Sequence, residues 1–186
     1  ALAALELRGW TPEGPVAEAI ALLAAEDWGA LAALGDVAAP MLARVVRETG
    51  GDPKSIERRC GAAHSLSAMG GQEAMVALEA ALNDGAGSVR AIAARGIGRN
   101  HLHVRPDVFP RLRQLLAEDS KAVVRVGAAT ALGLLGDDDA AGLLMNAAES
   151  DDSESVRFAA ARALASPNLG IVAPLPPPTS RRPTRP

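Results

Sequence analysis

The sequence contains very few aromatic residues and a single cysteine. Two of its 186 residues are tryptophan, two are phenylalanine and none is tyrosine. So few aromatic side chains disfavour a β-sandwich and fit layers of alanine- and leucine-rich helices. One cysteine, Cys60, excludes an internal disulfide framework, so we expect a reducing, cytoplasmic location.

Long apolar runs and an excess of basic residues are also missing. No run reaches the roughly 18 apolar residues that a membrane-spanning helix needs, so no membrane association is predicted. The 19 basic and 22 acidic residues give a net charge of −3, which provides no overall cationic surface for nucleic acid. The chain begins at Ala1 within an apolar pattern and without an initiator methionine, so we expect a monomer or part of a longer chain.

An alanine-rich pattern recurs along the chain. Its clearest copy is Val124-Arg125-x-x-Ala128-Ala129-x-Ala131-Leu132. The copies begin at Arg58, Val89, Val124 and Val156, at intervals of 31, 35 and 32 residues. Self-similarity at such a period predicts a solenoid, in which stacked helix pairs bury apolar faces that none of them could bury alone.

The pattern resembles HEAT repeats, in the shorter HEAT-like form found in phycobilisome-lyase subunits. Three features carry the resemblance: an arginine at the second position, an aspartate five places before the start, and an L-x-x-[LM]-G ending. The resemblance implies an all-α, right-handed α-solenoid of stacked antiparallel helix pairs. It also implies a structural ladder of side chains, which here would be Arg59, Arg90, Arg125, Arg157, Asp84, Asp119 and Asp151.

The solenoid is predicted to span residues 1–167, with 1–35 as an atypical capping module and 36–167 as repeats. Residues 168–186 form a Pro-rich tail. The first helices of the pairs (A helices) are expected at 36–49, 72–83, 107–118 and 138–149, and the second (B helices) at 54–69, 85–99, 121–135 and 153–165. Residues 16–25 are almost wholly apolar and are expected to be a buried helix, and Trp10 and Trp28 to be packing anchors.

The concave face is the predicted binding surface. The third, seventh and eleventh positions of each copy share one side of a helix with 3.6 residues per turn. An apolar strip rimmed by arginine suits a protein or peptide with apolar anchors and acidic flanks. The alternative is that the next repeat or the tail covers these residues. The partner-binding residues are predicted to be His64, Arg95, Arg99, Val126, Thr130, Leu134, Phe158 and Arg162.

Metal-binding residue types occur, but not in one place. Cys60 and His64 lie four residues apart on one helix, while His101 and His103 lie in a loop beyond the next helix. This separation is too large for one tetrahedral zinc shell, so no metal site is expected. No catalytic triad order, phosphate-binding loop or zinc-protease motif is present, so neither a cofactor nor an enzyme activity is expected.

The predicted function is therefore a non-enzymatic scaffold that binds a protein or peptide. The resemblance keeps open an accessory lyase-type or chaperone subunit, although few aromatic residues are available to line a pigment pocket. Bilin titration separates these two functions. Nucleic-acid binding is a third possibility because five arginines cluster around one repeat, but acidic residues flank every turn. The five are Arg95, Arg99, Arg105, Arg111 and Arg113.

Overall fold

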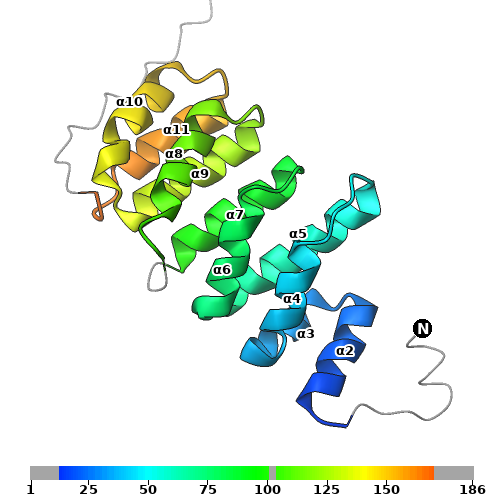
Figure 1. The fold of residues 1–186 in the computed structure, drawn as a ribbon. Helices are drawn as coiled ribbons and strands as arrows, with labels where there is room; N and C mark the ends of the chain where they lie inside the picture. The colour runs from blue at the N-terminus through cyan, green and yellow to red at the C-terminus, as the bar shows by residue number, and fades with distance from the viewer. Residues whose placement is uncertain (1–12, 101–103, 170–186) are drawn as a thin grey trace, which may run out of the picture.

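The computed structural model describes residues 13–100 and 104–169, and all regular structure within these ranges is helical (Figure 1). The predictions for Trp10, for the two loop histidines and for residues 170–186 lie outside the described residues. None of the described helices has both the length and the hydropathy needed to cross a membrane.

The helices form two layers (Figure 1). The A helices are α2 (Pro15–Ala25), α4 (Ala39–Val46), α6 (Gly71–Ala81), α8 (Val108–Glu118) and α10 (Ala141–Ser150). The B helices are α3 (Trp28–Ala33), α5 (Pro53–Met69), α7 (Gly87–Arg99), α9 (Ala122–Leu135) and α11 (Glu154–Leu164). Each B helix packs on its own A helix, and each one before α11 also packs on the next B helix, which confirms the predicted all-α solenoid.

Glycine and alanine allow the B helices to approach each other closely. A Cβ atom added to Gly98 in α7 would lie 2.7 Å from the Cα of Ala131 in α9. One added to Gly133 in α9 would lie 2.6 Å from the Cα of Ala163 in α11. These distances are too short for a methyl group against backbone, so the helix contact requires glycine at both positions.

The prediction of a buried helix at residues 16–25 is wrong. In α2 only Ala19 is buried, whereas Val16 and Ile20 are 57% and 55% exposed. The helix lies at the end of the stack, where it packs mainly on α3 (Figure 1). An apolar sequence therefore did not guarantee burial, because no preceding helix pair among the described residues covers this side.

Most predicted helix ends agree with the structure to within two residues, and the exceptions are two starts and the end of α4 at Val46. The helix predicted over 36–49 is α4, which begins only at Ala39, after a 3₁₀ turn over Gly35–Val37. Similarly, α10 follows a 3₁₀ turn over Asp138–Ala140. Both turns carry acidic residues, which are favourable where helical N–H groups are exposed.

The two ends of the stack differ in how they are closed. At the first end, the ring of Trp28 lies against Gly61, where an added Cβ would be only 2.4 Å from its Nε1. The hydroxyl of Ser65 donates to the carbonyl of Trp28 over 2.6 Å. At the other end, Leu169 is buried and the Asn168 amide donates to the carbonyl of Leu134 over 2.7 Å. Packing therefore continues past residue 167.

Candidate functional site

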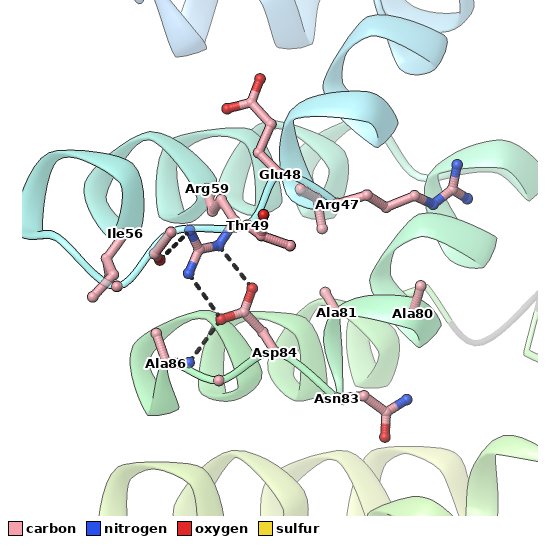
Figure 2. Close-up of a pocket in the computed structure, with 14 residues that line it drawn as sticks. Arg47, Glu48, Thr49, Ile56, Arg59, Ala80, Ala81, Asn83, Asp84 and Ala86 are labelled. Carbon is pink, nitrogen blue, oxygen red and sulfur yellow. Dashed lines mark hydrogen bonds and ion pairs between the residues drawn. The ribbon is translucent and has the colours of Figure 1, made fainter.

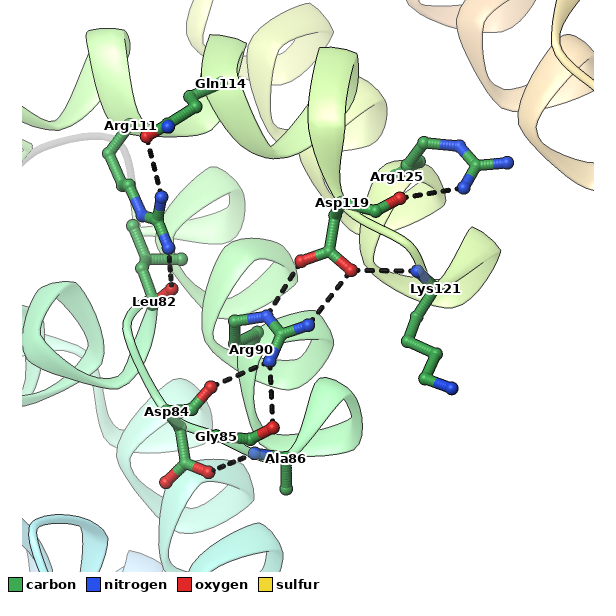
Figure 3. Close-up of polar contacts among 10 residues, drawn as sticks. All are labelled: Leu82, Asp84, Gly85, Ala86, Arg90, Arg111, Gln114, Asp119, Lys121 and Arg125. Carbon is green, nitrogen blue, oxygen red and sulfur yellow. Dashed lines mark hydrogen bonds and ion pairs between the residues drawn. The ribbon is translucent and has the colours of Figure 1, made fainter.

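The arginine and aspartate of neighbouring repeats meet along one edge of the solenoid. Each arginine places Nε and Nη2 on the carboxylate of the next repeat, and Nη1 on a carbonyl of its own turn (Figures 2 and 3). The pairs are Arg59–Asp84 (2.8 Å), Arg90–Asp119 (2.8 Å) and Arg125–Asp151 (2.7 Å). A guanidinium that binds a carboxylate through two hydrogen bonds combines ionic attraction with fixed geometry. The ladder therefore sets the spacing of successive repeats.

Each of these aspartates also organises its own turn. Its Oδ1 accepts a hydrogen bond from the backbone N–H two residues further on, at Ala86, Lys121 or Ser153. For Asp151, the hydrogen bond from Arg125 lowers the carboxyl pKa below its ordinary value, although burial opposes this. For Asp119, burial raises the pKa, but the hydrogen bonds from Arg90 and from the Lys121 N–H outweigh it and the net shift is downward.

A second inter-repeat contact was missed by the sequence analysis. The Asn100 amide donates to the carbonyls of Ser67 and Gly96, and so joins the ends of α5 and α7. Asn168 forms the equivalent bond to Leu134 at the end of α9. In the sequence this contact is marked only by an asparagine shortly after α7 and after α11. An asparagine is also common where a helix simply ends, so this mark is too weak to predict the contact.

The exposed side of α5, α7, α9 and α11 is called here the B-helix face. Four predicted binding residues, His64, Arg99, Leu134 and Arg162, are exposed on it, and Arg95 and Thr130 are half-buried. The third position of each copy behaves differently from the other two. It lies at the seam between B helices, so Ala91 is fully buried and Val126 half-buried. Phe158 is 64% exposed because α11 is the last described B helix.

The cations of the B-helix face have no carboxylate partner within the described part of the chain. Neither Arg95 nor Arg99 forms an ion pair there, and Arg162 lies over the ring of Phe158, 5.9 Å from its centroid. Although His64 is exposed, partial burial of its imidazole lowers its pKa, and the positive charges of Arg95 and Arg99 lower it further. The imidazole therefore lies in a cationic environment that favours an anion.

The five arginines that are close in sequence do not form one surface. Arg105 pairs with Glu79, and Arg113 with Asp137 and Asp139. Arg111 donates to the carbonyl of Leu82 and to Gln114 (Figure 3). These three belong to α8 or the segment just before it, whereas the other two lie on α7. Only Arg95 and Arg99 keep their charges available on the B-helix face.

The B-helix face carries no metal cluster among the described residues. Among residues 13–100 and 104–169 no three metal-ligating side chains come together, and the thiol of Cys60 lies 3.4 Å from the hydroxyl of Ser88. A hollow of about 670 Å³ lies at the ladder edge, beside Arg59 and Asp84 (Figure 2).

Comparison with known proteins agrees with this architecture. Residues 76–165 match the family model for HEAT repeats. A chain of the complex of CpcE and CpcF of phycocyanin lyase from Nostoc sp. PCC7120 is 26% identical, with a TM-score of 0.61. The match covers 88% of this chain and 97% of that chain. No curated protein sequence matches significantly.

Human deoxyhypusine hydroxylase, solved in complex with glycerol, is similar in fold. The identity is 24%, the TM-score is 0.55, and the match covers 69% of this chain. This chain spans only 42% of the hydroxylase.

The expectation of a non-enzymatic protein is wrong. The lyase subunit belongs to an enzyme, and the likeness to it extends over nearly the whole of both chains. A complete catalytic motif is not required within one chain when the enzyme is a complex of two proteins, as the complex of CpcE and CpcF is. This chain is a HEAT-like repeat protein: residues 76–165 match the HEAT repeat family, and the chain as a whole is similar to a subunit of phycocyanin lyase.

Proposed function

We propose that this protein is an accessory subunit of a lyase-type complex and that its B-helix face holds an anionic, partly apolar ligand. The observation that carries the proposal is the likeness to a phycocyanin lyase subunit over 88% of this chain and 97% of the other. A match confined to one repeat would support only a shared fold, whereas this one extends over most of both chains.

The side chains of the B-helix face support the same function. Arg95 and Arg99 are four residues apart, so both project from one side of α7. Their like charges repel each other, and no described carboxylate relieves the repulsion. A bound carboxylate would relieve it and would gain charge-assisted hydrogen bonds.

Apolar contact is available next to these charges. Leu134 on α9 is 41% exposed, and its Cδ1 lies close to Gly98 of α7, on the same side of the stack. A ligand with carboxylates on an apolar framework would therefore contact both kinds of group. A bilin has this chemistry, and so would an apolar protein segment with acidic flanks.

An absorbance titration of bilin with the purified protein tests the proposal. We expect a saturable spectral change, and we expect Arg95→Glu to weaken binding about tenfold or more, because it replaces an attractive charge with a repulsive one. Arg44→Glu is the matched control, since Arg44 is exposed on α4 and forms no ion pair among the described residues.

A spectrum that does not change on adding protein would overturn the lyase-type function. Equal weakening by the two substitutions would instead show that net charge, and not the B-helix face, controls binding.

A further inference from the structure

The α10–α11 end of the stack exposes positions that the next B helix covers in earlier repeats. In α7, Ala94 and Gly98 are buried beneath α9, and in α9, Ala129 and Gly133 are buried beneath α11. The equivalent residues of α11 are Ala161 and Ala165, which are half-buried and exposed. The last helix therefore has the small residues needed for close helix contact, but no helix lies on them among the described residues.

The ladder is also incomplete at this end. The Nη1 atom of Arg157 donates to the carbonyl of Asp151 over 2.7 Å, as the other ladder arginines do within their own turns. In Arg59, Arg90 and Arg125, Nε and Nη2 hold an aspartate of the next repeat. In Arg157 these two nitrogens have no carboxylate partner within the described ranges.

A second copy of the chain does not fit this end in the register of the repeats. The first B helix of the copy, α3, has only six residues (Trp28–Ala33), so stacking in that register would have to bring α5, the first helix that carries the repeat pattern, against α11. That side of α5 is already occupied, because the ring of Trp28 lies against Gly61 and α3 packs on α5. The aspartate of this repeat is also displaced by one position, to Asp52, where it accepts hydrogen bonds from Ser55 instead.

The segment that follows in the sequence lacks the required chemistry as well. Residues 170–186 contain no aspartate or glutamate and six prolines. They have no acidic side chain for Arg157, and their prolines are incompatible with a packed helix pair.

We propose that the α10–α11 end docks a partner protein through a HEAT-like repeat whose turn carries an aspartate. The aspartate completes the fork of Arg157, and a helix with small residues packs on Ala161 and Ala165 next to the exposed ring of Phe158. The internal repeats already form this contact, with an aspartate on the ladder arginine and small residues packed closely between B helices. They therefore define both the charge and the shape that the partner needs (Figure 3). This docking site does not depend on the proposed lyase-type function.

A copy of the protein's own last repeat is a defined probe for this end. Residues 137–168 are duplicated directly after Asn168, so that the copied Asp151 faces Arg157 and residues 169–186 are retained. We expect amide exchange in α11 to slow about tenfold or more, since an added layer protects it.

The ladder contact is tested by two substitutions in the same background. Arg157→Ala is expected to lower the melting midpoint of the extended chain by several degrees more than that of the parent chain. Asp→Asn in the copied turn should remove most of this difference. Unchanged exchange in α11, or an equal effect of Arg157→Ala in both chains, overturns the proposal.

Two measurements on the parent chain identify other occupants. Sedimentation is expected to show a monomer, and a dimer that Arg157→Ala dissociates would mean that a second copy occupies this end. Deleting residues 170–186 is expected to leave exchange in α11 unchanged, and faster exchange would mean that the tail covers it. Either of these results would mean that a second copy or the tail, and not a partner protein, occupies this end, and would overturn the proposal.

Discussion

At the scale of single residues, one arginine per repeat connects two turns. Its fork binds the carboxylate of the following repeat while Nη1 binds a carbonyl of its own turn. The sequence pattern predicted which residues take part, because the arginine and the aspartate recur at fixed places. It could not predict that the three carboxylates also fix their own turns, since that depends on backbone geometry.

Removal of a ladder arginine should cost stability according to its partners. Arg125→Ala is expected to reduce the free energy of unfolding by about 1–3 kcal/mol, because a largely buried carboxylate and a carbonyl lose their donor. Arg157→Ala is the matched control and should cost less than about 1 kcal/mol, because within the described residues this arginine bonds only to carbonyls. Chemical denaturation measures both values, and equal losses would contradict the structural importance of the ion pair.

His64 should make ligand binding depend on pH. Its pKa is lowered in the free protein by burial and by the charges of Arg95 and Arg99, so it is neutral at pH 7. A bound carboxylate favours the protonated imidazole, so binding takes up a proton and affinity should rise as pH falls from 8 to about 5. Titrations across this range should show a flatter profile for His64→Gln, and identical profiles would place the ligand elsewhere.

At the scale of helices, contact between B helices depends on residues with little or no side chain. The repeat pattern predicted the B helices well, because alanine recurs at the positions that face a neighbour. Burial of the terminal helix α2 could not be read from its apolar sequence, since burial depends on a neighbour that only the stack provides. For the same reason, the third position of each copy was assigned to the concave face, whereas Ala91 lies in the seam.

Two glycine substitutions separate helix contact from helix propensity. Gly133→Ala should destabilise the protein by about 1–3 kcal/mol, because its methyl group would overlap the backbone of α11. Gly142→Ala should stabilise it by about 0.5–1 kcal/mol, since α10 leaves open space there and alanine favours a helix. Thermal melts of the two variants should shift in opposite directions, and a stabilising Gly133→Ala would show that α9 and α11 are further apart than described.

At the scale of the whole molecule, the two edges of the solenoid have different chemistry. Arg59, Arg90 and Arg125 at the ladder edge and Arg113 on α8 are paired with carboxylates, whereas the cations of the B-helix face remain unpaired within the described ranges. The sequence predicted both groups of residues, but could not show that Arg105, Arg111 and Arg113 have local partners. Pairing across repeats depends on the rise and rotation of the stack, which no single repeat specifies.

Removing residues 170–186 tests whether the tail competes with the ligand. The tail carries three arginines and no acidic residue, so the cations of the B-helix face should repel it. Deletion should therefore change the affinity for bilin less than about twofold, because the positively charged tail is not attracted to the positively charged B-helix face. A clear tightening of binding would show that the apolar residues 171–175 act as an internal ligand.

We propose that the B-helix face is where this protein, as a subunit of a lyase-type complex, holds its ligand. Hydrogen exchange measured with and without saturating bilin tests it most directly, because it locates binding without a substitution. The account predicts slower exchange in the second halves of α5, α7 and α9, around His64, Arg99 and Leu134, with no change in α4 and α6. Protection confined to the hollow beside Arg59 and Asp84, or found nowhere in the chain, would contradict the claim.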